Sequence, residues 1–299
     1  MKIRIGSRGS NLALTQTNWV GDQLKAKYPD LEVEVVIIKT KGDKILDVAL
    51  DKIGDKGLFV KELETALFEK KIDFAVHSMK DMPSDMTPGL AIAPTPLRVD
   101  RRDVLILKEG YKTLEDLPEN SVIGTGSKRR CFQLLEARPD LRFEPIRGNI
   151  ETRIKKLSSQ NLDGIVLAAA GIHRLGLDSV ITAYMEDDLC LPAPAQGALA
   201  IQYRSDDQVI LDLLTSIADL EAQKEIVAER SFLKHTKGGC HVPVGAVAHR
   251  QGDDLILKGL FGKEDGSRLV KASIRGPLEQ GEALGKQLAD QILKEVNHG

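Results

Sequence analysis

The sequence predicts an α/β protein with two α/β domains joined by a hinge, followed by a small α+β domain at the C-terminal end. Three observations favour this organisation. Strand-like and helix-like segments alternate over the first two-thirds of the chain, which is typical of parallel sheets with helices on both faces. Prolines interrupt the pattern at 94–96 and 192–194. The last part of the chain instead combines two helical segments with three consecutive strand-like runs.

The first domain is expected to comprise residues 1–97 and 198–217, so that the chain crosses to the second domain and returns. Ser10 is suited to cap the first helix, in which Leu12, Trp19, Val20 and Leu24 share one face. The segment 32–38 is rich in β-branched residues, which favours a strand. The predicted strands are 2–6, 32–38, 73–76 and 198–203, and a second helix covers 59–70. The polar stretch 40–57 contains three glycines and is interpreted as a long loop.

The second domain is expected over 98–197 and the third over 218–299. In the second, strands are predicted at 103–108, 121–123, 143–146 and 164–168, with helices at 127–138 and 149–158. In the third, helices at 219–236 and 278–295 flank strands at 244–250, 254–263 and 268–274. Consecutive strands without helices between them indicate an antiparallel sheet.

Composition narrows the classes of function. Of the 299 residues, 42% are hydrophobic and 29% charged, and the formal net charge is -2. Near-neutral charge and 4% aromatic residues disfavour a nucleic-acid-binding protein. No apolar run approaches a membrane span. Three scattered cysteines, Cys131, Cys190 and Cys240, fit a reducing cytoplasm better than a disulfide framework.

Positive charge is concentrated between residues 124 and 155, around two glycine-containing turns. Each turn follows a short apolar run and opens a helix-like segment, where backbone N–H groups and the helix dipole favour an anion. The basic residues there are Lys128, Arg129, Arg130, Arg138, Arg142, Arg147, Arg153 and Lys155. Arginines at such turns predict a ligand with several carboxylates or phosphates.

Three further strand ends carry polar residues. Arg8 and Ser10 follow the first strand, and Arg174 follows the strand near 165–168. Ser78, Lys80 and Asp81 follow the strand that ends at Val76, where open α/β sheets bind ligands. Asp81 beside a lysine could stay ionised and stabilise a cation, or could only organise the turn before Pro83. His77 is interpreted as a satisfied structural histidine.

Cys240 lies on a glycine loop, 238–243, that ends in a proline. It could be an exposed reactive thiol or a buried structural cysteine. A metal site with His241 has no second ligand pair, and no metal is expected. Adjacent side chains on extended chain point in opposite directions, so His241 is poorly placed to act as a base for Cys240. Cys131 and Cys190 are interpreted as packing residues.

Taken together, these segments resemble the hydroxymethylbilane synthase family, also called porphobilinogen deaminases. The resemblance covers nearly the whole chain and depends on the combination of short motifs. They are 56–64, 77–81, Arg129-Arg130, Arg147-Gly148-Asn149 with Arg153, 196–198, and Gly239-Cys240 with Val242-Pro243.

The resemblance implies two periplasmic-binding-protein-like domains and a small third domain that carries a cofactor cysteine. It also implies an enzyme that condenses four porphobilinogen molecules head to tail with release of ammonia, then releases hydroxymethylbilane by hydrolysis. The growing chain is attached to a dipyrromethane cofactor through a thioether, here to Cys240. Asp81 would be the catalytic aspartate. The cofactor-binding residues would be Lys80, Asp81, Ser127, Arg129 and Arg130, and the substrate-binding residues Arg8, Ser10, Gln16, Ser78, Thr125, Arg147, Arg153 and Arg174.

This chain departs from the usual family pattern at four positions, Asp55, Gly126, Lys128 and Pro194. Lys128 could contact a carboxylate or face solvent. The loop 42–57 could shield a cation from water.

We expect a cytoplasmic monomer with no nucleic-acid or membrane partner. The main alternative is a non-catalytic, two-lobed anion receptor, which would leave Cys240 and the third domain without a role.

Overall fold

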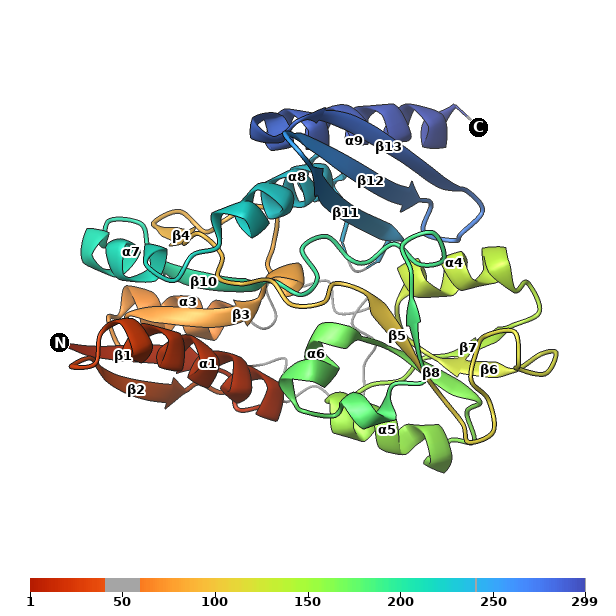
Figure 1. The fold of residues 1–299 in the computed structure, drawn as a ribbon, viewed down its shortest axis with the longest axis horizontal. Helices are drawn as coiled ribbons and strands as arrows, with labels where there is room; N and C mark the ends of the chain where they lie inside the picture. Colours follow the sequence, from red (N-terminus) through yellow and green to blue (C-terminus); the bar gives the residue numbers. More distant parts are fainter. Residues whose placement is uncertain (41–59, 240, 299) are drawn as a thin grey trace. The chain divides into compact units, whose positions relative to one another are not determined.

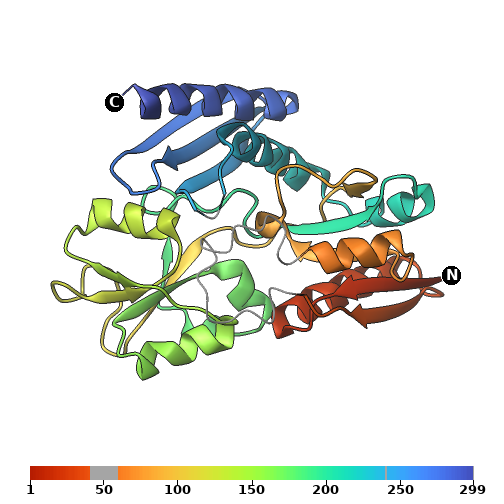
Figure 2. The same cartoon turned by 180° about the vertical axis from the view of Figure 1, so that it is seen from behind.

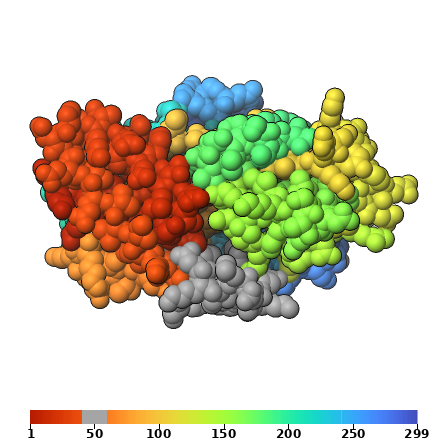
Figure 3. Space-filling view, turned by 90° about the horizontal axis from the view of Figure 1, so that it is seen from below, coloured from red at the N-terminus to blue at the C-terminus, as the bar shows by residue number. Residues whose placement is uncertain are grey.

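The computed structural model describes residues 1–40, 60–239 and 241–298; the remaining residues are grey in Figure 3. The predicted loop over 42–57, with the shielding role suggested for it, and Cys240 therefore lie outside the described residues. The chain divides into two compact units, one of residues 1–99 with 198–223 and one of 100–197 with 224–299. The division into three domains stays a prediction, and each unit is described by itself.

The first unit contains a five-stranded sheet in the order β2-β1-β3-β10-β4 (Figure 1). Its strands are β1 (Lys2–Ser7), β2 (Glu32–Ile37), β3 (Phe74–Ser78), β4 (Leu90–Ile92) and β10 (Leu199–Arg204). Its helices are α1 (Asn11–Lys27), α3 (Lys61–Phe68), α7 (Gln208–Thr215) and the short 3-10 turn η2 (Met79–Asp81).

Alternation along β1 places its two main helices on opposite faces of the sheet. Ile5 packs in a cluster with Val20 and Leu24 of α1. A Cβ on the next residue, Gly6, would lie 3.0 Å from Leu63 of α3. Because consecutive strand residues point to opposite faces, α1 and α3 cover the sheet from both sides. The predicted α/β architecture of this part of the chain is confirmed.

The second unit contains another five-stranded sheet, in the order β7-β6-β8-β5-β9. Its strands are β5 (Asp103–Leu107), β6 (Val122–Gly124), β7 (Arg142–Glu144), β8 (Gly164–Ala168) and β9 (Ala183–Met185). Its helices are α4 (Lys128–Ala137), α5 (Ile150–Ser159), α6 (Ala169–Arg174) and the turn η3 (Asp178–Val180). Leu105 packs with Leu134 of α4, whereas Val104 packs with Ile154 of α5, so these helices lie on opposite faces.

The predicted parallel pairing is present for β1 with β2 and β3 and for β6 with β7 and β8, but both sheets are mixed. β10 runs antiparallel to β3 and β4, and β5 runs antiparallel to β8 and β9. Parallel neighbours arise when a strand, a crossover helix and the next strand form one unit. β5 and β10 instead follow the two passages of the chain from one unit to the other, so they enter their sheets without such a crossover. The short strands β4 and β9, which flank them, were not predicted.

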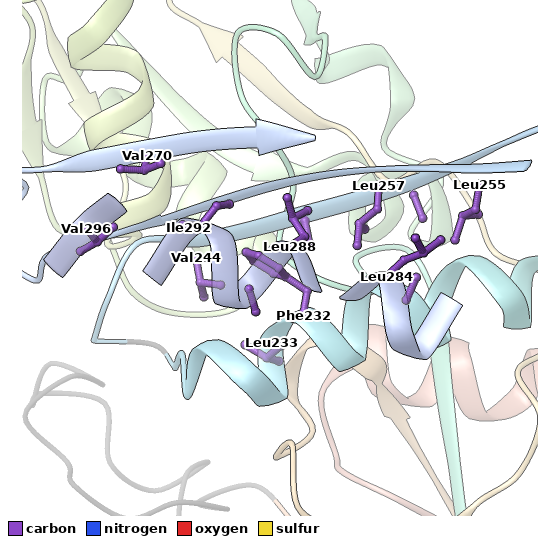
Figure 4. Packing of buried hydrophobic residues seen from close by; sticks show 14 of the residues in the cluster. Phe232, Leu233, Val244, Leu255, Leu257, Val270, Leu284, Leu288, Ile292 and Val296 are labelled. Atoms are coloured by element: carbon purple, nitrogen blue, oxygen red, sulfur yellow. The ribbon is translucent and has the colours of Figure 1, made fainter. Parts of the chain in front are cut away.

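The third sheet is an antiparallel meander of β11 (Val244–Gln251), β12 (Asp254–Gly262) and β13 (Leu269–Pro277). It is covered by α9 (Gly281–Asn297), which follows the turn η4 (Leu278–Gln280), and by α8 (Leu220–Thr236). Leu284, Leu288 and Ile292 of α9 and Phe232 of α8 form its core with strand residues such as Leu257 (Figure 4). The predicted helix-covered antiparallel sheet is confirmed.

One face of α4 contacts the turn between β12 and β13, and the two lie side by side in Figures 1 and 2. Lys128 Nζ lies 2.9 Å from Glu264 Oε1, and Lys271 Nζ lies 2.6 Å from Glu136 Oε2. Between these ion pairs, Phe132 packs so close to Gly266 that a Cβ on the glycine would lie 2.4 Å from the ring. Residues 128, 132 and 136 are four apart and therefore share one side of the helix.

Candidate active site

In the first unit, the candidate residues follow two neighbouring parallel strands. β1 and β3 pair in parallel, so Arg8 and Ser10, which follow β1, lie at the same edge of the sheet as Ser78, the last residue of β3, and Lys80 and Asp81, which follow it. Gln16 of α1 reaches this edge, and its Nε2 donates to Ser78 Oγ at 3.0 Å.

The side chains at this edge differ in exposure and in their partners. Asp81 is exposed within η2, whereas Lys80 and Arg8 are half-buried. Ser10 has the predicted cap role, since its hydroxyl accepts from the Ala13 N–H at 3.3 Å. The edge therefore presents an accessible carboxylate close in sequence to a lysine and a serine.

His77 is buried, as expected of a structural histidine, but it is not fully satisfied. Its Nε2 is buried and has no hydrogen bond of ordinary length within the part of the chain that the structure describes. Burial lowers the pKa of His77 to about 4, and the nearby Gln202 amide only partly opposes this effect. The positive charge of Arg8 lowers the pKa further. His77 is therefore neutral near pH 7 and stands directly before Ser78.

In the second unit, three strand ends meet at one edge of the sheet. β6 pairs in parallel with both β7 and β8, so the segments that follow them emerge on the same side. Thr125, Ser127 and α4 follow β6, Arg147 and α5 follow β7, and α6 with Arg174 follows β8. Thr125 is buried, and its hydroxyl accepts from the Ser127 N–H at 3.3 Å.

Arg129 and Arg130 are buried and share one carboxylate, that of Asp103. Arg129 Nη1 lies 2.6 Å from Asp103 Oδ2, and Arg130 Nη2 lies 2.7 Å from Asp103 Oδ1. Burial alone would raise the pKa of Asp103, but the two guanidinium charges and their hydrogen bonds hold it far below its usual range. These arginines belong to an internal ion cluster and are not solvated surface charges.

Arg147 and Arg153 lie around the second turn. Arg153 Nε donates to the Gly148 carbonyl at 2.8 Å, and Gly148 adopts a φ of 111°, which favours glycine. Asn149 caps α5 by accepting from the Thr152 N–H at 2.8 Å. Arg147 Nη2 is buried and has no hydrogen-bond partner among the described residues. An unpaired buried guanidinium donor is costly, so this position favours an anionic ligand.

Arg174 gives a similar indication. Its Nη2 donates to the Gly197 carbonyl at 2.8 Å, and no carboxylate within the described ranges forms an ion pair with it. Burial without a compensating charge lowers the pKa of Arg174 to about 10. The side chain stays protonated at pH 7, and a ligand carboxylate would compensate its charge.

Cys190 and Cys131 are free thiols, and burial raises the pKa of each, to about 12 and about 11. Both therefore resist ionisation, as expected for packing residues. Cys190 also contacts the ion cluster, with its Sγ 3.6 Å from Arg129 Nη1.

Of the four positions that depart from the family pattern, Lys128 pairs with Glu264, whereas Asp55 lies outside the described residues.

Asp103 and Gln196 were missed as parts of the site. Asp103 opens an otherwise apolar strand, and Gln196 Nε2 donates to its Oδ1 at 2.9 Å. A charged residue at the start of a fully buried strand is the signal that could have identified Asp103, because such a charge requires a partner. In the described ranges, no group of three or more metal-binding side chains is present, and no helix is long and apolar enough to cross a membrane.

The fold and the site define an α/β protein whose strand ends gather arginines for a polyanionic ligand. Comparison with known families narrows this class. The model described as "Porphobilinogen deaminase, dipyromethane cofactor binding domain" matches residues 3–212, and "Porphobilinogen deaminase, C-terminal domain" matches 223–294. The chain belongs to the porphobilinogen deaminase family, and it is a transferase with a dipyrromethane cofactor. The resemblance inferred from the motifs is confirmed, and the receptor alternative was wrong.

Individual relatives are similar to this chain over nearly the whole length of both sequences. A porphobilinogen deaminase of Clostridioides difficile (strain 630) is 55% identical, with 100% of this chain and 99% of that protein aligned. One from Clostridium novyi (strain NT) is 53% identical over 99% and 100%. Among solved structures, the methionine-binding protein MetQ covers 75% of this chain and 90% of its own, with 14% identity and a TM-score of 0.46.

The residues present fit the cofactor that the family implies. A dipyrromethane with acetate and propionate arms presents several carboxylates. The unpartnered Nη2 of Arg147 and the uncompensated charge of Arg174 are groups that carboxylates would satisfy. Polypyrrole acids are therefore a chemically reasonable occupant of this edge of the second unit.

Proposed function

We propose that this chain joins four porphobilinogen molecules head to tail on a dipyrromethane cofactor bound to Cys240, releases ammonia at each step, and then hydrolyses the linear tetrapyrrole product free. The match of the dipyrromethane-binding family model to residues 3–212 carries the proposal. That range contains every strand-end cation named above. The hydroxymethylbilane synthase function of the family accounts for their number, since each pyrrole brings two carboxylates.

The arginines are assigned to the acidic arms of cofactor and substrate. A charge-assisted hydrogen bond contributes about 1.5–3 kcal/mol, and a guanidinium can hold a carboxylate through two parallel bonds. The buried, unpartnered donor of Arg147 and the desolvated charge of Arg174 support this role. The other proposed contacts, divided between cofactor and substrate as the resemblance implies, are Arg8, Ser10, Gln16, Ser78, Lys80, Thr125, Ser127, Arg129, Arg130 and Arg153.

Asp81 is assigned to the reacting centre. Loss of ammonia from porphobilinogen leaves an electron-poor methylene-pyrrole cation. A carboxylate that accepts from the ring N–H would stabilise this cation more than the neutral substrate, which lowers the barrier. The exposure of Asp81 and its position at the carboxyl end of β3 support the assignment.

Cys240 is assigned to cofactor attachment. A thioether is stable where an ester would be hydrolysed, so the cofactor would stay attached through successive turnovers. On either side of Cys240 in the sequence, the Val242 N–H donates to the Gly239 carbonyl at 3.3 Å. β11 begins two residues later, at Val244.

We further propose a cytoplasmic monomer whose small-molecule partner is porphobilinogen, with no nucleic-acid or membrane partner. The free thiols of Cys131 and Cys190 support a reducing compartment. Light scattering coupled to size-exclusion chromatography would test the oligomeric state, and a mass well above 32.8 kDa would contradict the monomer.

Intact-mass spectrometry tests the attachment. The purified chain should be heavier than its sequence by two linked pyrrole units, and the Cys240→Ala variant should lack this adduct. Cys131→Ala is the matched control and should keep it. A wild-type mass equal to the sequence mass, together with no consumption of porphobilinogen, would refute the proposed function. An adduct that survives Cys240→Ala would refute only the site of attachment.

A further inference from the structure

Asp103 lies at the centre of the buried ion cluster, where it contacts the two arginines at the start of α4, Gln196 and the Cys190 thiol. It is fully buried at the start of β5. Oδ2 accepts from Arg129 Nη1 at 2.6 Å, and Oδ1 accepts from Arg130 Nη2 at 2.7 Å and Nε at 3.2 Å. Gln196 Nε2 adds a bond of 2.9 Å. The carboxylate thus fixes both arginines of α4 against the sheet.

The two arginines use different edges of their guanidinium groups. Arg130 places its Nε–Nη2 edge on Asp103 and donates from Nη1 to the Val166 carbonyl at 2.9 Å. Arg129 uses only Nη1, which donates to Asp103 and to the Leu191 carbonyl at 2.7 Å. Its Nε and Nη2 donate to no atom in the described part of the chain. These two nitrogens form the edge that binds a carboxylate through parallel bonds.

The charge balance of the cluster also indicates that Arg129, and not Arg130, binds a further carboxylate. Two guanidinium groups and one carboxylate leave the cluster with a net charge of +1. Because buried charges require compensation, a second carboxylate is favoured beside it. Arg129 has the open edge for such a group, whereas the corresponding edge of Arg130 is occupied by Asp103.

We propose that Asp103 is a positioning residue for cofactor capture: it anchors Arg130 and turns the Nε–Nη2 edge of Arg129 toward a carboxylate arm of the dipyrromethane. This inference rests on the proposed function. It refines the assignment of both arginines as contacts given above: Arg129 contacts the arm directly, and Arg130 contributes to binding only through Asp103.

Cofactor loading gives the first test, because it is measured by mass and not by turnover. Asp103→Asn removes the charge with little change of shape. The matched control is Asp73→Asn, since Asp73 also binds an arginine, Arg4, at 2.9 Å but in the first unit. We expect the fraction of purified chain that carries the adduct to fall at least tenfold in Asp103→Asn and to stay near the wild-type value in Asp73→Asn.

A folded Asp103→Asn protein with a wild-type adduct fraction would overturn the inference, and so would an equal loss in both variants. If the wild type itself carries no adduct, the proposed function fails instead. Circular dichroism of each variant establishes whether the comparison is made between folded proteins.

A second measurement leaves Asp103 intact and so does not depend on the folding of that variant. Nitrogen NMR of the arginine Nε–H groups is compared between the wild type, which holds the cofactor, and Cys240→Ala, which lacks it. The Arg129 Nε–H resonance should shift between the two proteins, and the Arg130 Nε–H resonance should not. An unchanged Arg129 resonance, or a shift confined to Arg130, would overturn the assignment.

Discussion

Replacing His77 with glutamine should make the stability of the first unit less dependent on pH. The unfolded chain takes up a proton on this imidazole below its ordinary pKa of about 6.5. In the folded unit, burial holds the pKa of His77 at about 4, so the imidazole binds a proton only in much more acidic solution. Acid therefore favours the unfolded state, and stability falls as the pH drops from about 6.5 toward 4.

The size of this effect follows from the two pKa values. Between pH 7 and pH 5, the difference in proton binding lowers the free energy of unfolding by about 2 kcal/mol, and below pH 4 the loss levels off. Glutamine keeps a polar side chain near Gln202 but binds no proton. The variant should therefore lose about 2 kcal/mol less than the wild type over the same interval.

The single tryptophan, Trp19, lies on α1 and reports on this unit. Urea unfolding followed by its fluorescence, at pH 7 and at pH 5, gives the two free energies for each protein. Other titrating groups contribute equally to both, so the comparison isolates His77. If the wild type and His77→Gln lose the same stability on acidification, the interpretation of His77 as a buried neutral group is refuted.

Three further changes should have distinct results. Asp81→Asn should lower the rate of porphobilinogen consumption on the order of 100-fold or more while the adduct mass persists; near-normal turnover would remove Asp81 from the mechanism. Arg174→Met should raise KM on the order of tenfold, because the substrate carboxylate loses its guanidinium partner. Unchanged steady-state kinetics would argue against a contact between Arg174 and the substrate. Asn149→Ala should lower the free energy of unfolding by about 1 kcal/mol in urea titrations, since the cap to the Thr152 N–H is removed; an unchanged value would show that the cap contributes nothing.

Local patterns predicted most helices and strands because each depends on residues close in sequence. Ser10 was identified as a cap from its place before a helical segment, and the cap bond to Ala13 is present. The strands β5 and β10 were located correctly, but their antiparallel direction depends on the path of the chain between units. Periodicity along one strand carries no information about that path.

The sequence predicted strand ends rich in arginine but could not separate the roles of individual side chains. The local sequence does not distinguish Arg129 from Arg130, because the geometry of both side chains is fixed by Asp103. Asp103 is 26 residues from Arg129 in the chain. The sequence indicates a structural role for His77, but that its Nε2 lacks a partner among the described residues depends on packing against neighbouring strands. The partners of buried polar groups come from distant parts of the chain, and local sequence patterns do not specify them.

The contact between α4 and the β12–β13 turn limits how this chain can change. The helix has ten residues, and its Phe132 is pressed against Gly266 while its Arg129 and Arg130 belong to the ion cluster. A larger residue in place of Gly266 would push Phe132 and so tilt the arginines, although the two positions are far apart in sequence. A larger residue at position 266 should therefore be accepted only together with a smaller one at position 132, and transplanting the C-terminal sheet from a relative would require the helix that matches its β12–β13 turn.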